Sequence, residues 1–198
     1  KKIPIVSLFA FSRENWARPA DEVAFLMELF VRVLARELPE LHAQNVRVQF
    51  IGDKTQLSAK LCADIQSAEL HTAENKALLL NIALNYTGKW DILQATRTIA
   101  QRVMDGALAI AQIDDAVFAS YLSTSQLPEP DLFIRTSGEQ RISDFFLWQL
   151  AFTELYFTET KWPDFTLEEF ERALTAFHLR ERRYGLISKQ LKASGEIN

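Results

Sequence analysis

Short apolar runs alternate with longer stretches of helical periodicity along the first half of the chain. Residues 3–11 are apolar and partly β-branched with no helical period, which predicts a buried strand. Residues 20–44 repeat apolar side chains at three- and four-residue steps, which predicts an amphipathic helix that Pro39 kinks or ends. Residues 46–51 alternate as a strand does, and a second helical pattern covers residues 57–68. This half therefore predicts the order strand, helix, strand, helix.

The second half continues the alternation. Residues 77–84 are almost continuously apolar, as expected of a central strand that is covered on both faces. Helical patterns occupy residues 89–104 and 113–122, and a short apolar strand follows at residues 132–134. Residues 166–169 begin with Thr and end with Glu, the spacing of a capping box, which predicts the start of a last helix.

Strands that alternate with helices predict an α/β protein with a mainly parallel central sheet flanked by helices, built as a single domain over residues 1–198. The length agrees, because 198 residues with 48% hydrophobic and 24% charged side chains suit one well-packed core. The formal net charge of −4 argues against nucleic acid as a partner, because no overall positive field attracts a polyanion. An anionic ligand therefore needs a local basic cluster.

The single cysteine, Cys62, excludes an intrachain disulfide and a Cys-rich zinc site, and it favours a reducing, cytoplasmic setting. No uncharged stretch reaches the length of about 20 residues that a membrane-spanning helix needs. The three histidines, His42, His71 and His178, fall in helical patterns without metal-ligand spacing. We therefore assign them surface or packing roles.

A polar loop after the last predicted strand has the residue types of an anion-binding site. It runs from Arg135 to Ser143 and contains a second guanidinium, of Arg141, together with hydroxyl groups and Gly138. Guanidinium groups match phosphate oxygens, and glycine lets backbone N–H groups approach an anion. Ligands of open parallel sheets collect at the carboxyl ends of strands, where this loop begins. The alternative is a solvated loop with ion pairs to Glu139.

A second polar cluster, residues 12–19, follows the first predicted strand. An arginine of this cluster would bind a further anionic group, and Asn15 would orient a polar atom. Trp16 would pack against an apolar substrate chain. The alternative is a capped turn between strand and helix in which Trp16 belongs to the core, and spacing alone does not decide between the two.

Glu154 lies in an apolar stretch, where an unpaired carboxylate is costly, so it needs a partner. Either Mg²⁺ that bridges carboxylate and phosphate oxygens or an ion pair with an arginine supplies one.

An apolar cavity between the first helix and the central strand is a further hypothesis. A basic mouth on such a cavity would suit an amphiphile that carries a diphosphate. Ordinary core packing is the alternative, because stripes of Met and aliphatic side chains usually belong to the core. The side chains concerned are Leu26, Met27, Phe30, Leu34, Leu78 and Leu80.

Three long segments have a distinctive sequence: residues 9–19 (FAFSRENWARP), 81–91 (NIALNYTGKWD) and 131–145 (DLFIRTSGEQRISDF). Shorter ones follow in order: residues 147–149, 154–157, 162–165 and 180–185. Together they resemble the cis-prenyltransferases, and among these the bacterial undecaprenyl diphosphate synthases. Several long motifs at consistent spacing are far more specific than any one of them.

The resemblance implies a Mg²⁺-dependent transferase that condenses isopentenyl diphosphate with an allylic diphosphate, farnesyl diphosphate, in cis. The product would be undecaprenyl diphosphate, a lipid-carrier precursor for cell-wall biogenesis. The resemblance also implies a homodimer in the cytoplasm, with transient contact at the inner membrane surface. The alternatives are a non-catalytic partner subunit of a prenyltransferase complex and a general α/β phosphate-binding module.

The resemblance further implies roles for single residues. Asn15 occupies a catalytic position, and because a neutral amide is a very weak base, we expect it to position a water or diphosphate oxygen that takes the proton. Glu154 would help to coordinate Mg²⁺ and complete the neighbouring subunit's site. The remaining substrate-binding residues would be Ser12, Arg13, Glu14, Trp16 and Arg18 at the reacting end, and Arg135, Arg141, Ile142 and Ser143 at the diphosphate of isopentenyl diphosphate.

One family segment has no counterpart in this sequence. The pattern Met-Asp-Gly-Asn-Gly-Arg-Trp-Ala, which carries the family's catalytic aspartate, normally precedes the Ser-x-x-Asn-Trp region. We therefore expect the chain to be N-terminally incomplete and, as given, inactive or nearly so.

Overall fold

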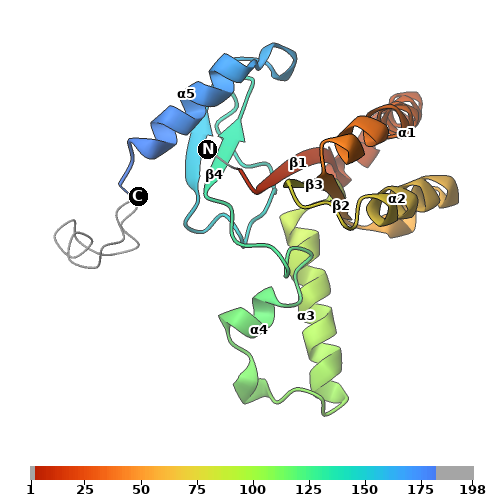
Figure 1. Ribbon diagram of the computed structural model, residues 1–198. Helices are drawn as coiled ribbons and strands as arrows, with labels where there is room; N and C mark the ends of the chain where they lie inside the picture. The colour runs from red at the N-terminus through yellow and green to blue at the C-terminus, as the bar shows by residue number, and fades with distance from the viewer. Residues whose placement is uncertain (1–2, 182–198) are drawn as a thin grey trace. The chain divides into compact units, whose positions relative to one another are not determined.

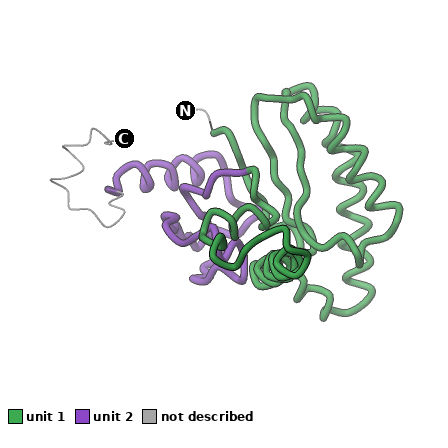
Figure 2. Tube along the Cα trace, turned by 90° about the horizontal axis from the view of Figure 1, so that it is seen from below, with its two compact units in different colours: residues 1–126 green, residues 127–198 purple. Residues whose placement is uncertain are grey.

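Parallel strands form the centre of both compact units of the chain, Lys1–Gln126 and Leu127–Asn198 (Figures 1 and 2). The computed structural model describes residues 3–181, and each unit is described by itself. The predicted α/β class with parallel strands and flanking helices is confirmed. The strands form two sheets, of three and two strands. The assignment of residues 1–198 to a single domain stays a prediction.

The first unit is built on a sheet in the order β1-β3-β2. The central strand pairs in parallel with both neighbours, with Ser7 beside Asn81 and Gln49 beside Asn81. The strands are β1 (Ile5–Ser12), β2 (Val46–Ile51) and β3 (Leu78–Tyr86), and the helices are α1 (Ala20–Ala43), α2 (Ala59–His71), α3 (Gly88–Met104) and α4 (Asp115–Ala119). Three single-turn helices are η1 (Arg13–Ala17), η2 (Lys54–Gln56) and η3 (Ile110–Gln112).

A hydrophobic core joins α1 and α2 to this sheet. Its buried members include Leu34 of α1, Ile65 of α2, Phe50 of β2 and Leu84 of β3. Burial of each such side chain contributes roughly 1.5–3 kcal/mol relative to an exposed position. The core therefore fixes the sheet against the two helices and fixes the strand ends from which the polar loops start.

The second unit contains β4 (Leu132–Arg135), β5 (Glu154–Phe157), η4 (Trp162–Asp164) and α5 (Leu167–His178). The two strands pair in parallel, with Arg135 beside Phe157. The predicted start of the last helix at Thr166 is confirmed, because the Thr166 hydroxyl accepts a hydrogen bond from the backbone N–H of Glu169 at 3.4 Å; the second half of the capping box is absent, since the Glu169 carboxylate accepts from Arg172 and Thr160 instead. The strand β5 lies in an aromatic-rich segment for which no element was predicted.

Two helix predictions need correction. Helix α1 does not end at Pro39 but continues to Ala43, and a kink at Pro39 stays a prediction. The helix expected at residues 113–122 is shorter: α4 covers Asp115–Ala119, and Asp114 caps it by accepting a hydrogen bond from the Val117 N–H at 2.8 Å.

Candidate active site

The turn η1 begins directly after β1 and holds the predicted catalytic residue. The backbone N–H of Ser12 donates a hydrogen bond of 2.9 Å to Oδ1 of Asn15, so the side chain folds back on the turn. The amide hydrogens on Nδ2 of Asn15 make no hydrogen bond with residues 3–181. In this geometry Asn15 holds the turn with its oxygen and has its two amide hydrogens available to an acceptor.

Trp16, the next residue, is held on two sides. Its indole Nε1 donates to Oδ1 of Asn85 at 2.8 Å, and its ring meets the edge of Phe11 with centroids 5.4 Å apart. The half-buried side chain also packs against the core of the unit. The core-packing alternative therefore describes Trp16 in this structure, and its role in substrate binding stays a prediction.

Arg13 is fixed by the carboxylate of Asp53, just after strand β2, although β3 lies between β1 and β2 in the sheet. Its Nη1 donates to Oδ2 of Asp53 at 2.6 Å, and its guanidinium lies 6.0 Å from the ring centroid of Trp90, a cation–π contact. Because the side chain is still one-third exposed and has further N–H donors, an anion can bind to it without breaking the ion pair.

Asp53 stays ionised for local reasons. Partial burial raises its pKa, but hydrogen bonds from Thr55 and Arg13, with the Arg13 charge, lower the pKa below the ordinary value of 3.8. Its Oδ1 accepts from the backbone N–H of Thr55 at 3.0 Å and from the Thr55 hydroxyl at 2.6 Å. The carboxylate is therefore a permanent partner for Arg13 near neutral pH.

Two residues let the ends of β2 and β3 approach closely. Gly52 has φ = +123°, and a Cβ atom there would overlap the carbonyl oxygen of Leu84 and lie 3.0 Å from its carbonyl carbon. Asn85 has φ = +52° and is fully buried, and its Nδ2 donates to the backbone carbonyl of Asp53 at 2.7 Å. Gly52, Asp53 and Asn85 were not predicted as site residues. The sequence signal that could have identified Asp53 and Asn85 is the position of a polar residue at the end of a buried strand.

The outer part of the turn lies on the surface. Arg18 and Glu14 are exposed, and Nη1 of Arg18 pairs with Oε1 of Glu22 at 2.9 Å. An exposed pair of this kind is weak, about 0.3–0.5 kcal/mol, so an incoming anion can displace Glu22. The structure brings Ser12, Arg13, Asn15 and Trp16 together at one strand end, with Arg18 beside them in sequence.

Arg135 is the last residue of β4 in the second unit. Its backbone carbonyl accepts from the Thr158 N–H at 2.9 Å, whereas its half-buried guanidinium has no hydrogen bond or ion pair with residues 3–181. Arg141 is exposed and pairs with Glu139, as the solvated-loop alternative predicted. Ile142 and Ser143 are half-buried in the same loop, and Ser143 has φ = +51°.

Two backbone N–H groups around Gly138 are already used within the second unit. The N–H of Ser137 donates to the Thr160 carbonyl at 2.8 Å and the N–H of Gly138 to the Thr158 carbonyl at 2.9 Å, so neither is available to an anion. Positive φ, +70°, favours glycine at position 138; a Cβ atom there would also meet the carboxylate of Glu159, a flexible side chain that can move away. An anion at this loop would therefore need other donors than these two N–H groups, such as the guanidinium groups of Arg135 and Arg141.

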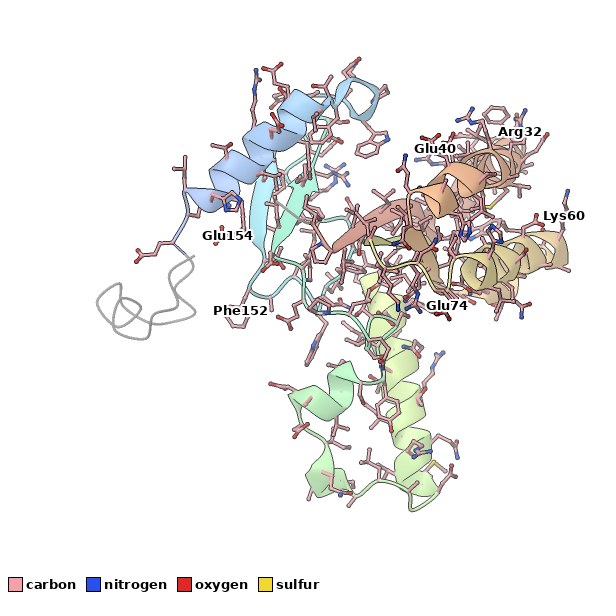
Figure 3. All side chains as sticks on the ribbon, viewed as in Figure 1. Arg32, Glu40, Lys60, Glu74, Phe152 and Glu154 are labelled. Atoms are coloured by element: carbon pink, nitrogen blue, oxygen red, sulfur yellow. The ribbon has the colours of Figure 1, made fainter. Side chains whose placement is uncertain are left out.

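Glu154, labelled in Figure 3, is the first residue of β5. Its Oε2 accepts from Nη1 of Arg180 at 2.8 Å, and the same Nη1 donates to the Leu155 carbonyl at 2.8 Å. The ion-pair alternative is thus the arrangement in this structure. Residues 182–185, the rest of the motif that begins at Arg180, lie outside the described residues.

Most of the proposed cavity residues pack against the core of the first unit. Leu26, Met27, Phe30 and Leu80 are half-buried and contact the core cluster, Leu34 is one of its buried members, and Leu78 is half-buried at the start of β3. The exposed side chains Phe25, Leu29 and Val33 lie four residues apart on the same helix. The cavity stays a prediction, and core packing describes the present arrangement.

Comparisons with known proteins agree with one another. Residues 1–185 match the family model described as "Putative undecaprenyl diphosphate synthase". A ditrans,polycis-undecaprenyl-diphosphate synthase ((2E,6E)-farnesyl-diphosphate specific) of Legionella pneumophila (strain Paris) is 56% identical over 189 residues, which are 96% of this chain and 79% of that protein. The protein of the same name in Vibrio cholerae is 51% identical, over 96% of this chain and 76% of its own length.

Solved structures give the same result. Lavandulyl diphosphate synthase from Lavandula x intermedia, in complex with dimethylallyl diphosphate, superposes with a TM-score of 0.90 at 39% identity, over 92% of this chain and 79% of that chain. A probable undecaprenyl diphosphate synthase from Campylobacter jejuni superposes with a TM-score of 0.82 at 37% identity, over 92% and 84% of the two chains. The chain therefore belongs to the undecaprenyl diphosphate synthase family, within the cis-prenyltransferases.

Proposed function

We propose that the protein condenses isopentenyl diphosphate with farnesyl diphosphate in cis, repeatedly, to make undecaprenyl diphosphate. The names of its relatives in Legionella pneumophila and Vibrio cholerae support this substrate and product. The observation that carries the proposal is Arg135, a half-buried guanidinium at the carboxyl end of β4 without a partner among residues 3–181. A guanidinium without a protein partner can bind an anion, and a diphosphate matches its geometry.

The turn η1 would serve the reacting end of the substrates. The allylic carbon loses diphosphate and joins the double bond of isopentenyl diphosphate, which then loses a proton. Arg13, fixed by Asp53, offers positive charge to the departing diphosphate. Asn15 would use its amide hydrogens to position a diphosphate oxygen or a water as the proton acceptor, because its own oxygen already accepts from Ser12.

Mg²⁺ enters the proposal through the family. Residues 3–181 contain no group of three or more His, Cys, Asp or Glu side chains that could hold a metal ion. Glu154 offers one carboxylate, which is paired with Arg180. These residues alone do not make a magnesium site, so none of the roles given to Arg13 and Asn15 depends on the metal. As a ligand, Glu154 would first have to break its ion pair with Arg180.

Three further proposals concern the cavity, the membrane and the oligomeric state. We propose that the protein is a homodimer and that it contacts the inner membrane surface transiently from the cytoplasm to release its long hydrocarbon product. The side chains that line the space for the growing hydrocarbon chain would be Leu26, Met27, Phe30, Leu78 and Leu80. Among the described helices, none combines the length and apolar character that crossing a bilayer requires. Exposed apolar side chains of the second unit, among them Phe152 in Figure 3 and Trp162, support the proposed homodimer.

The test uses the full-length protein with radiolabelled isopentenyl diphosphate, farnesyl diphosphate and Mg²⁺. We expect label to enter a butanol-extractable polyprenyl diphosphate, and chromatography against standards would give its chain length. A folded protein that incorporates no label would contradict the proposal and favour a non-catalytic partner subunit. Equal binding of inorganic diphosphate and farnesyl diphosphate would favour a general phosphate-binding module instead.

A further inference from the structure

Asn85, the penultimate residue of β3, connects the ends of all three strands of its sheet. Its Oδ1 accepts from the indole Nε1 of Trp16, in the turn after β1, at 2.8 Å. Its Nδ2 donates to the carbonyl of Asp53, just after β2, at 2.7 Å. Its own backbone carbonyl accepts from the Asp53 N–H at 3.1 Å. One fully buried amide thus fixes two segments that are distant in sequence.

The backbone at this position also favours asparagine. Asn85 has φ = +52°, in the left-handed region where Asn is enriched relative to other residues with a Cβ atom. The side chain has 0% exposure, so an amide oxygen that lost Trp16 would be left buried and unsatisfied, whereas Nδ2 also has a long contact with Oε1 of Gln56 at 3.5 Å. Both the conformation and the hydrogen bonds therefore select this side chain.

We propose that Asn85 is a positioning residue for the condensation reaction. Two routes lead from its amide into the turn η1: one through the indole of Trp16, which directly follows Asn15, and one through the Asp53 backbone to the carboxylate that holds Arg13. The inference rests on the proposed function, because it assigns Asn85 to the same reacting-end turn. Asn85 itself touches no substrate in this proposal; it sets where Asn15 and Arg13 stand.

The consequence is a specific kinetic effect. Small displacements of groups that act on the reacting atoms lower the rate of the chemical step strongly, by up to about 100-fold for roughly 1 Å. Ground-state binding of the diphosphates depends on other contacts as well, those of Arg135 included. Loss of the Asn85 amide should therefore lower kcat much more than it raises KM.

The first variant is Asn85→Gly, which removes the amide but tolerates positive φ. We expect kcat at 25 °C to fall roughly 10- to 100-fold, with KM for farnesyl diphosphate changed less than about threefold. The matched control is Asn45→Gly, because Asn45 also has positive φ, +59°, and also accepts a backbone hydrogen bond, from Lys76 at 2.9 Å, outside the turn. Asn45→Gly should keep the wild-type kcat.

Trp16→Phe separates the two routes, because it removes the indole N–H and keeps an aromatic ring. It should lower kcat by part of the effect of Asn85→Gly, and the double variant should fall no further than Asn85→Gly alone, since the two changes break the same hydrogen bond. Additive losses in the double variant would overturn the route through Trp16.

Asn85→Asp gives a signature that a merely structural role would not produce. Its ionised carboxylate accepts from Trp16 but cannot donate to the Asp53 carbonyl, whereas the protonated carboxyl does both. Burial raises the pKa of the introduced carboxyl, so kcat relative to wild type should rise as the pH is lowered from 8 to 6. A flat ratio would overturn the proposal, and this profile also decides the matter if Asn85→Gly fails to fold.

The outcomes distinguish a failure of the proposed function from a failure of the role of Asn85. Wild-type protein that incorporates no isopentenyl diphosphate would refute the proposed function. Active wild-type protein with a folded Asn85→Gly variant whose kcat stays within twofold of it would refute the role of Asn85 alone.

Discussion

Gly52 is the position where a single methyl group should disturb the site most severely. The residue has φ = +123°, and a Cβ atom there would overlap the Leu84 carbonyl oxygen and lie 3.2 Å from the carbonyl carbon of Asn85. These atoms belong to the backbone of the central strand β3 and cannot rotate away. Gly52→Ala must therefore separate the ends of β2 and β3 or move Asp53.

The magnitude follows from two contributions. A residue with a Cβ atom in this backbone conformation costs on the order of 1–3 kcal/mol in strain. Displacing paired backbone adds the loss of the Asp53–Asn85 hydrogen bond, about 1 kcal/mol, and of packing around it. We expect a loss of about 3 kcal/mol in the free energy of unfolding, which lowers Tm by roughly 6–12 °C in a protein of this size.

Gly106 provides the matched control. It also has positive φ, +70°, but a Cβ atom there would meet nothing within 4 Å. Gly106→Ala should therefore show the strain alone, about 1 kcal/mol, and a Tm lower by roughly 2–4 °C.

Thermal unfolding of the full-length protein, followed by circular dichroism and repeated with urea, measures both variants. Gly52→Ala should also lower kcat, because Asp53 no longer holds Arg13 in place. If Gly52→Ala and Gly106→Ala lower the free energy of unfolding equally, the close approach of β2 to β3 adds no cost at position 52, and the prediction is wrong.

Three other predictions test separate parts of the site. Arg135→Ala should lower kcat/KM for isopentenyl diphosphate roughly 30-fold or more, the effect of a lost charge-assisted hydrogen bond of about 2 kcal/mol, with Arg135→Lys intermediate; unchanged kinetics would reject its role. Leu80→Trp, or a bulky residue at Leu78, should shorten the product if these side chains face the growing chain, and an unaltered product distribution would place them in ordinary core. Asp53→Asn should lower the free energy of unfolding near neutral pH. Because the folded-state pKa of Asp53 is lowered, this loss should be constant above about pH 5, shrink as the pH falls below 3.8, and vanish once the wild-type carboxyl is protonated in both states. Denaturant unfolding that gives a constant difference between wild type and variant down to about pH 2 would contradict the Arg13–Asp53 pair.

Periodicity alone predicted most of the elements, because helices and buried strands expose or bury side chains with different periods. It predicted the strand at residues 46–51 at the observed bounds and placed both polar clusters at strand ends. The strand β5, Glu154–Phe157, was not predicted, because it begins with a carboxylate inside a longer aromatic-rich stretch, whereas the equally short β4 is an apolar run; its pairing partner is known only after folding.

The supporting network of the site could not be read from the sequence for a physical reason. The partner of Arg13 is Asp53, 40 residues away, and the partner of Trp16 is Asn85, 69 residues away. These contacts depend on the order of strands in the sheet, which local patterns do not contain. Composition also does not tell which donors of the loop around Gly138 are available: the N–H groups of Ser137 and Gly138 already donate to Thr160 and Thr158.

The strand order β1-β3-β2 also constrains how the first unit can be made during translation. The first two strands have no hydrogen bonds with each other, and every ladder in the sheet requires the third strand, Leu78–Tyr86. A nascent polypeptide that has emerged only as far as α2 therefore lacks the strand with which β1 and β2 pair in this sheet, and unpaired apolar strands are prone to association. Synonymous codons that slow synthesis before residue 78 should lengthen the interval in which β1 and β2 lack this partner.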